Sequence, residues 1–288
     1  MSENKQRHIL ITGGTGLVGE HIKKHLSNID YKITSVSRSF SEKRNHFSID
    51  LLNKEMVKEF IDSLDKIDVI IHCAAIAHGE RPPSGLNIAD FNSSILINLL
   101  EAFKKNQPHW IFMSSVAVYG DMHSNKAIPI IQNPIPFDDY GLGKIRDENE
   151  LIRNCPHLDI LRLTPVYDMQ NLDDIKKRVF IPKTNFIISI FPSPKHSICH
   201  LNQISTFINK CLKDYPGQRF SQVADQSPIR QKELIRFFVG TKIYIPKLFI
   251  NLVFYLLPKR FAHTRKAAFM LKKFGLSNIY QVGRQQIN

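Results

Sequence analysis

The beginning of the chain constrains its fold more than any other segment. Within residues 8–26, an apolar run leads into the turn TGGTGLVG at residues 12–19, and a helical pattern follows. A strand, a glycine-rich turn and a helix in this order are typical of the first βαβ unit of a nucleotide-binding domain. Gly13 would permit the tight turn, Gly16 the approach of a pyrophosphate and Gly19 close packing of the helix. The segment therefore predicts a dinucleotide-binding α/β fold.

Apolar runs and helical stretches continue to alternate along the chain. After about Tyr167 the pattern becomes irregular and rich in proline. The alternation predicts an α/β protein with a Rossmann doubly wound parallel sheet. We expect residues 1–166 to form the dinucleotide-binding domain and residues 167–288 mainly a smaller substrate-binding lobe, with segments such as 195–212 returning to the Rossmann sheet. The apolar runs fall at residues 32–36, 69–71, 110–113 and 160–163, and the helical stretches at residues 53–64, 91–105 and 143–154.

The positive charge of the chain is concentrated at its C-terminal end. The 288 residues carry a formal net charge of +13, and no Asp or Glu follows Glu233. Such an end suits an anionic partner, which could be a nucleotide diphosphate or an anionic membrane surface, although a solvated basic face explains it equally well. Nucleic acid is not expected, because no recognition motif is present. The ten basic residues are Arg236, Lys242, Lys247, Lys259, Arg260, Arg265, Lys266, Lys272, Lys273 and Arg284.

Cysteine, histidine and apolar patterns restrict the class of protein further. The four cysteines show no Cys-x-x-Cys pair, and the first residues are polar, so we expect a cytoplasmic protein with free thiols. The twelve histidines form no ligand cluster, which argues against a metal. Residues 243–257 are the most apolar stretch but are too short for a membrane span. A core helix is the favoured interpretation, and a helix lying on the inner membrane face stays open.

Tyr140 and Lys144 form the strongest candidate for acid–base chemistry. Residues four apart on a helix lie on the same face. A nearby ammonium favours the phenolate, so a tyrosine placed in this way is expected to exchange protons at neutral pH. The pair predicts a proton-transfer site.

The end of the second expected strand bears on the choice of cofactor. An enzyme that prefers NAD usually places an acidic residue there to hold the ribose hydroxyls. This chain has Ser37 and Arg38 instead, which suit a 2′-phosphate. The sequence therefore weakly favours NADP over NAD, while a solvent-facing Arg38 stays an alternative.

Eight motifs follow one another with consistent spacing between residue 12 and about residue 205. They are residues 12–19, Asp50-Leu51, 71–75, Phe91-Asn92 leading into 98–102, 113–120, 140–144, 161–167 and 197–201. In this order the chain resembles the extended short-chain dehydrogenases/reductases, the NAD-dependent epimerase/dehydratase family of nucleotide-sugar epimerases, dehydratases and reductases.

The resemblance implies specific roles. Ser115, Tyr140 and Lys144 would be the catalytic set, and Asn92 would support the active-site helix. NAD or NADP would be the cofactor. Its binding residues would be Thr12, Gly13, Thr15, Gly16, Leu17, Val18, Gly19, Ser37, Arg38, Asp50, Leu51, Ala74, Ala75, Ser114, Tyr140, Lys144, Pro165 and Val166.

The residues after the serine bear on the reaction. Sugar 4,6-dehydratases of this family carry an acidic pair there, whereas this chain has Val116 and Ala117. The resemblance therefore favours a 4-epimerase acting on a nucleotide sugar or a polyprenyl-diphosphate sugar, in bacterial-type surface polysaccharide synthesis. An NADPH-dependent keto-sugar reductase and a non-catalytic dinucleotide-sensing scaffold are the alternatives. A homodimer and a peripheral contact with an anionic membrane stay open.

Several positions depart from the pattern of the family. Gly143 replaces a serine, Asp168 a glycine and Asn202 an aspartate, and no arginine clearly matches the one that clamps the nucleotide diphosphate. Lys195 or His196 is the expected substitute for that arginine. Further candidate substrate contacts, chosen because they adjoin segments expected to face the site, are His72, His78, Arg81 and His200.

Overall fold

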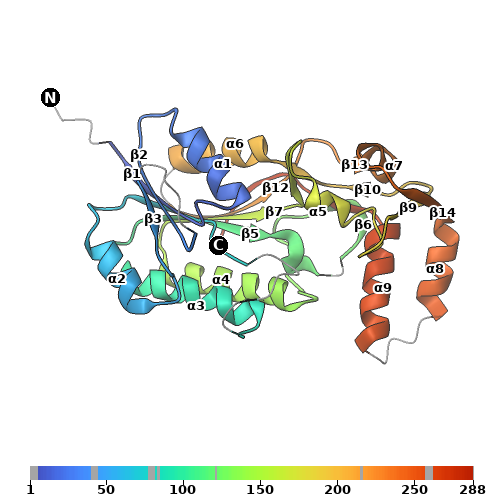
Figure 1. Ribbon diagram of the computed structural model, residues 1–288, viewed down its shortest axis with the longest axis horizontal. Coiled ribbons are helices and arrows are strands. Elements are labelled where there is room, and N and C mark those ends of the chain that lie inside the picture. The colour runs from blue at the N-terminus through green and yellow to red at the C-terminus, as the bar shows by residue number, and fades with distance from the viewer. Residues whose placement is uncertain are drawn as a thin grey trace.

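The centre of the protein is a single eight-stranded sheet. The computed structural model describes residues 6–39, 45–76, 82, 85–120, 122–214, 217–256 and 262–287. Neighbouring strands of the central sheet are parallel, apart from the antiparallel pair β12 and β16. The predicted doubly wound sheet is therefore confirmed. The strand order is β16 (Gly283–Gln286), β12 (Gln218–Val223), β7 (Leu158–Leu163), β5 (His109–Ser115), β4 (Val69–His72), β1 (His8–Thr12), β2 (Lys32–Ser37) and β3 (His46–Ser48) (Figure 1).

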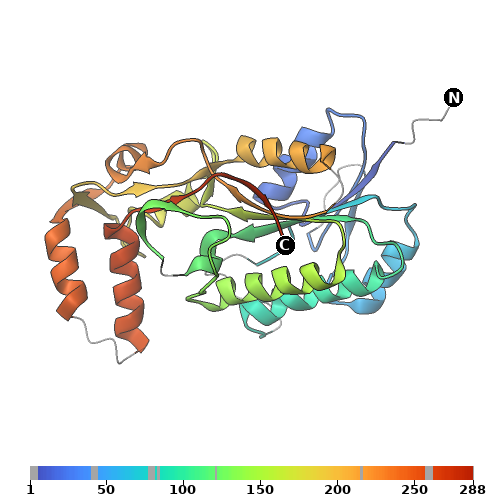
Figure 2. The same cartoon turned by 180° about the vertical axis from the view of Figure 1, so that it is seen from behind.

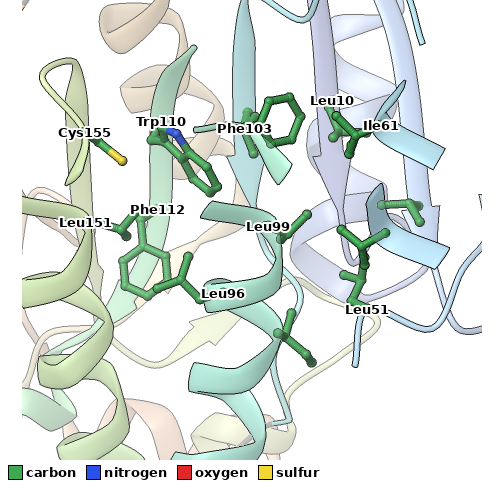
Figure 3. Close-up of a cluster of buried hydrophobic side chains, with 14 of the residues drawn as sticks. Leu10, Leu51, Ile61, Leu96, Leu99, Phe103, Trp110, Phe112, Leu151 and Cys155 are labelled. Carbon is green, nitrogen blue, oxygen red and sulfur yellow. The ribbon is translucent and has the colours of Figure 1, made fainter. Parts of the chain in front are cut away.

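Helices cover both faces of this sheet. Helices α1 (Leu17–Leu26) and α6 (Leu201–Lys213) lie on one face, and α2 (Lys54–Asp62), α3 (Ile88–Ala102) and α4 (Asp139–Asn154) lie on the other (Figures 1 and 2). The central strands are buried on both sides, which explains why they read as continuous apolar runs. On the α3 and α4 side, the core includes Leu96, Leu99, Trp110, Phe112 and Leu151 (Figure 3).

Side-chain caps fix where three of these helices begin. The side chain of Asn53 accepts a hydrogen bond from the backbone N–H of Met56 at 3.0 Å, and that of Asn87 accepts one from Asp90 at 2.8 Å. Asp138 does the same for Gly141 at 2.9 Å. Such caps satisfy backbone donors that the first turn of a helix leaves free. The Asp138 cap matters most for function, because it sets the start of the helix that carries Tyr140 and Lys144.

The second part of the fold consists of smaller sheets at one end of the central sheet. The elements are β6 (Ser124–Ile128), β10 (Lys195–His196), β13 (Ile229–Arg230) and β15 (Asn278–Tyr280) in one sheet, β8 (Val166–Tyr167) with β11 (Cys199–His200), and β9 (Phe186–Phe191) with β14 (Thr241–Pro246). Short helical turns occur at η1 (Val116–Tyr119), α5 (Asp173–Lys176), α7 (Gln231–Leu234) and η2 (Ile235–Phe237).

Two longer helices project from that end as a hairpin. They are α8 (Lys247–Leu256) and α9 (Ala262–Gly275), which lie side by side with α8 outermost (Figures 1 and 2). Within the described residues, no helix is long and apolar enough to span a bilayer. The division into domains at residue 167 stays a prediction. Of the elements that follow that position, β12 and β16 are strands of the central sheet and α6 covers one of its faces.

A buried histidine joins the ends of two central strands. The Nδ1 atom of His72 lies 2.7 Å from Oγ1 of Thr12, and the same oxygen accepts a hydrogen bond from the backbone N–H of Ala74 at 3.2 Å. The His72 ring stacks on Phe112, with 5.8 Å between centroids. Burial lowers the pKa of His72 to about 3, so the ring is neutral at ordinary pH.

This histidine makes the fold sensitive to acid. Above the ordinary histidine pKa, His72 is neutral in both states and its native contacts are fully present. Below that pH the unfolded chain binds a proton that the folded protein excludes, so stability is lost as the pH falls toward 3. Between about pH 7.5 and about pH 5, we expect His72 to account for a loss of about 2 kcal/mol in the free energy of unfolding.

Urea titrations at the two pH values test this expectation. His72→Gln should remove about that much of the pH dependence, because glutamine does not titrate. Thr12→Val removes the hydrogen-bond partner but keeps the titrating ring, so it should lower stability at both pH values. An unchanged pH dependence in His72→Gln would contradict the assignment.

Candidate active site

The glycine turn after β1 is shaped by close backbone contacts. Gly13 has a φ of +69°, and a Cβ placed on it would lie 2.7 Å from the backbone nitrogen of Ala74. A Cβ on Gly19 would lie 2.3 Å from the carbonyl oxygen of Gly13. Gly16 is different, because its nearest contact would be an ordinary 3.4 Å. Gly13 and Gly19 therefore hold the turn against β4 and α1, whereas Gly16 leaves space at the helix N-terminus.

A cavity of about 920 Å³ opens beside this turn. Its volume is in the range that suits a cofactor or a small substrate. It runs from the carboxyl ends of the central strands to the second part of the fold. Of the predicted site residues, it is lined by Gly13, Gly16, Leu17, Val18, Gly19, Ala75, Ser114, Ser115, Tyr140, Lys144, Pro165 and Val166.

Ser115, Tyr140 and Lys144 converge on this cavity from two elements. Ser115 ends β5, where its hydroxyl accepts a hydrogen bond from the backbone N–H of Ala117 at 3.1 Å and also contacts the Tyr140 phenol. Tyr140 and Lys144 lie one turn apart near the start of α4. The Nζ atom of Lys144 is 5.9 Å from the centroid of the Tyr140 ring. It donates a hydrogen bond to the carbonyl oxygen of Met113 at 2.9 Å.

The electrostatics of this group differ from the sequence expectation in one respect. Burial raises the pKa of Tyr140, and the negative charge of Asp174 raises it further, although the hydrogen bond from Ser115 opposes both. Burial also lowers the pKa of Lys144. The pKa of the phenol is therefore raised rather than lowered as expected, because the removal of the phenolate from water outweighs the stabilising hydrogen bond from Ser115.

A buried network holds the second half of α4 against the sheet. Arg162 of β7 forms two hydrogen bonds to the Glu148 carboxylate, at 3.0 and 2.7 Å. The hydroxyl of Ser114 donates to the same carboxylate at 2.6 Å, and Arg162 also donates to the Tyr119 hydroxyl at 2.8 Å. Tyr119 is thus a buried member of this network.

A basic cluster on the cavity was not identified from the sequence. It consists of Lys177 and Arg178, which follow α5, and Lys273 of α9. Burial, together with the charges of Arg178 and Lys177, lowers the pKa of Lys273 to about 7. In the sequence, the run Lys176-Lys177-Arg178 could have indicated a basic site. Only the fold shows that Lys273 lies in the same cluster. Lys195 and His196, the expected substitutes for the family arginine, do not line the cavity.

The other predicted site residues lie outside the cavity. Thr12 and Ala74 support the turn from behind, Thr15 is exposed, and Leu51 is in the core. Ser37 is buried and donates a hydrogen bond to the carbonyl of Ser39. Arg38 is exposed, with its guanidinium carbon 5.5 Å from the centroid of Phe91, and Asp50 is exposed beyond β3.

The candidate substrate contacts also fall elsewhere. His72 is buried against Thr12, and His200 caps α6 by accepting a hydrogen bond from Asn202. His78 and Arg81 lie outside the described residues. Asn92, expected to support the active-site helix, accepts a hydrogen bond from the backbone N–H of Ile76 at 2.8 Å.

The structure explains why residue 143 is a glycine where the family pattern has a serine. A Cβ on Gly143 would lie 2.8 Å from Cα of Ala89, so α3 and α4 approach too closely there for a larger residue. Gly141 is equally constrained, since its Cβ would lie 2.6 Å from the carbonyl oxygen of Ala117. The two glycines bring the first turn of α4 close to both neighbours.

Comparison with known proteins identifies similar chains. Residues 9–153 match the NAD dependent epimerase/dehydratase family. The UDP-glucose 4-epimerase of Vibrio cholerae is 26% identical over 249 residues, covering 80% of this chain and 74% of that enzyme. The methionine adenosyltransferase 2 subunit beta of Danio rerio is 28% identical over 166 residues, covering 54% of this chain and 47% of that protein. This chain thus spans about half the length of the second relative.

A solved structure shows the same fold. The UDP-Glc/GlcNAc 4-epimerase of Campylobacter jejuni superposes with a TM-score of 0.69 at 19% sequence identity. The match covers 83% of this chain and 87% of that one.

The glycine turn provides a matched pair of substitutions. Gly19→Ala should lower the free energy of unfolding by about 1–3 kcal/mol, because the new methyl overlaps the Gly13 carbonyl. It should also weaken dinucleotide binding at least about tenfold. Gly16→Ala should preserve stability and weaken binding alone, because its methyl has room in the protein but would occupy space facing the cavity. Thermal unfolding measures the loss of stability and titration with the dinucleotide measures the loss of affinity. Equal losses of stability in the two variants would contradict the predicted difference between Gly16 and Gly19.

Proposed function

This chain belongs to the NAD-dependent epimerase/dehydratase family, and from that premise we propose that it is a nucleotide-sugar 4-epimerase that uses NAD(P). The observation that carries the proposal is the convergence of Ser115, Tyr140 and Lys144 on a cavity that the basic cluster also lines. A relative with 26% identity is named as a UDP-glucose 4-epimerase, which supports the same reaction.

The residues of the turn fit a dinucleotide. A Cβ at Gly13 would fill space that the backbone needs, and α1 directs its free N-terminal N–H groups toward the cavity. When bound, the nicotinamide supplies reversible hydride acceptance. The preference for NADP stays a prediction that rests on Ser37 and Arg38 at the end of β2.

Proton transfer is assigned to Tyr140. As the phenolate, it accepts the proton of the sugar hydroxyl at the carbon that is oxidised, and as the phenol it returns the proton to that oxygen, which the Ser115 hydroxyl also binds. Lys144 orients the phenol and offers its ammonium to the cofactor ribose. The raised pKa of Tyr140 favours the phenol, which is the form that returns the proton to the sugar, so the phenolate that accepts the proton depends on the adjacent Lys144 ammonium.

The basic cluster is assigned to the substrate diphosphate. Lys177, Arg178 and Lys273 line the cavity together, and Arg178 supplies a planar group suited to phosphate oxygens. The sugar would then lie between this cluster and Tyr140. A polyprenyl diphosphate sugar carries the same diphosphate and is the alternative substrate for this subsite. A role in surface polysaccharide synthesis stays a prediction of the sequence.

Dehydration is not favoured at this site. The two residues that follow Ser115 are Val116, which is buried, and Ala117, which lines the cavity. Neither has a titrating group able to protonate a leaving hydroxyl. Net reduction of a keto-sugar by NADPH needs the same three catalytic residues, so only product analysis separates it from epimerisation.

A non-catalytic scaffold is the second candidate. It is supported by the relative named as the beta subunit of a methionine adenosyltransferase, with 28% identity over 166 residues. The retention of Ser115, Tyr140 and Lys144 around one cavity favours turnover instead.

Turnover of UDP-glucose and UDP-N-acetylglucosamine tests the proposal. We expect formation of the 4-epimer with no net change in NAD(P)H absorbance, because the hydride returns to the sugar. Tyr140→Phe should lower kcat by about 10²- to 10⁴-fold, because the proton-transfer group is lost, while dinucleotide affinity is retained. Stoichiometric consumption of NADPH would indicate the reductase, and full activity of Tyr140→Phe would remove the mechanism.

The basic cluster predicts a pH dependence of substrate capture. Lys273, with a pKa of about 7, loses its positive charge as the pH rises through neutrality. We therefore expect kcat/KM for an anionic substrate to fall between about pH 6 and about pH 8. Lys273→Gln should lower kcat/KM at pH 6 by about tenfold and flatten this part of the profile.

The matched control is Lys176→Gln. Lys176 belongs to the same basic run, but it is exposed and pairs with Asp173 at 3.0 Å outside the basic cluster. Its substitution should leave the pH profile unchanged. A Lys273→Gln enzyme with the wild-type profile would exclude Lys273 from substrate binding.

A further inference from the structure

Strands β9 and β14 and helix α8 lie together at one end of the molecule (Figure 1). Several of their hydrophobic side chains are exposed. Phe191 is 80% exposed and Leu248 is 79% exposed. Proteins that stay monomeric in water rarely expose a contiguous patch of this kind without a partner. We call this patch the apolar end surface, and its five residues, each more than half exposed, are Phe191, Tyr244, Leu248, Phe249 and Leu252.

The backbone places these residues next to one another. In the ladder between β9 and β14, Phe191 pairs with Pro246, two residues beyond Tyr244, so the three residues share one face. Helix α8 begins at Lys247, directly after Pro246. Leu248, Phe249 and Leu252 then follow at a spacing that puts them on one side of the helix. The surface is therefore continuous from the sheet to the helix.

The other side of α8 is fixed to the protein. Ile250 is buried, with 3% exposure, in a cluster with Ile188 and Ile190 of β9 and Phe274 of α9. A Cβ on Gly275 would lie 2.7 Å from Cγ2 of Ile250, which shows how closely the two helices pack. The exposed leucines are thus presented on an anchored helix.

The charges around this surface favour an anionic partner. Lys242 is exposed on β14 and Lys247 begins α8, while no Asp or Glu occurs after Glu233. Lysine stems can lie along an apolar surface while the ammonium reaches phosphate groups. A second copy of this surface would bring lysines against lysines, and the segment from β14 to α9 offers no carboxylate to pair with them.

We propose that the apolar end surface docks on an anionic lipid bilayer, with α8 lying in the headgroup region. A helix of ten residues spans about 15 Å, which is half of a hydrocarbon core, so it suits the interface rather than a crossing. Apolar side chains beside lysines are the composition that binds such interfaces.

The hairpin also connects the docked surface to the cavity. On α9, Phe269 and Lys273 line the cavity, and the Phe269 ring stacks on Phe137 with 4.1 Å between centroids. Phe274 of the same helix packs against Ile250 of α8. Docking therefore holds the basic cluster close to the membrane, where a lipid-linked diphosphate sugar would be presented. Docking itself does not require the proposed epimerase activity.

Vesicle co-sedimentation of the full-length protein tests the proposal. We compare vesicles of phosphatidylcholine alone with vesicles that also contain phosphatidylglycerol, at low and high salt. The protein should pellet with the anionic vesicles, and pelleting should decrease as salt increases. Leu248→Gln combined with Leu252→Gln should reduce the partition coefficient at least about tenfold.

Three further measurements make the result specific. Ile131→Gln combined with Met169→Gln removes two equally exposed apolar side chains elsewhere, 63% and 69% exposed, and should leave partitioning unchanged. Lys242→Gln combined with Lys247→Gln should weaken binding to anionic vesicles and leave the residual binding to neutral ones unchanged. Turnover of a soluble nucleotide sugar, or circular dichroism if there is none, shows that each variant is folded.

Three outcomes would overturn the proposal. One is wild-type protein that stays in the supernatant with anionic vesicles. Another is a Leu248→Gln, Leu252→Gln protein that is folded and partitions as the wild type does. The third is concentration-dependent self-association that these two substitutions abolish without any vesicle binding by the wild type, which would assign the surface to a subunit contact.

Discussion

The geometry of the candidate site depends on one buried ion pair, between Arg162 of β7 and Glu148 of α4. Both side chains are almost fully buried, and their closest atoms are 2.7 Å apart. Ser114 of β5 and Tyr119 of η1 bond to the same pair, so four elements meet at it. Loss of one partner would leave a charge in a dry interior, which is far more costly than loss of an exposed ion pair. The pair therefore fixes the position of α4, and with it Tyr140 and Lys144.

Glycines determine how closely the elements around this pair can approach. Gly141 and Gly143 bring α4 against η1 and α3, and Gly13 and Gly19 bring α1 against the turn after β1. The cavity lies between these two groups of contacts. One side of it is therefore built from backbone, which suits phosphate groups, and the other from titrating side chains. The same arrangement explains the raised pKa of Tyr140, because the close packing that positions the phenol also removes water from it.

The second part of the fold supplies the basic cluster of the cavity. Lys177 and Arg178 follow α5, whereas Lys273 arrives from the hairpin almost a hundred residues later. Burial, together with the neighbouring charges of Arg178 and Lys177, lowers the pKa of Lys273 to about 7. The two helices of the hairpin thus differ in what they contact: Lys273 of α9 lines the cavity, whereas Leu248 and Leu252 of α8 are exposed.

The sequence alone determined the α/β class, the glycine turn and the pairing of Tyr140 with Lys144, because each depends on local spacing along one strand or helix. It also placed Ser115 at the end of an apolar strand, where parallel strands present their site residues. The tertiary structure decided which distant cations share the cavity, and it excluded Lys195, His196, His72 and His200 from its lining. It also decided that burial, rather than the neighbouring ammonium, dominates the pKa of Tyr140. The physical reason is that desolvation and contacts between remote segments depend on how the layers pack, which local sequence patterns do not record.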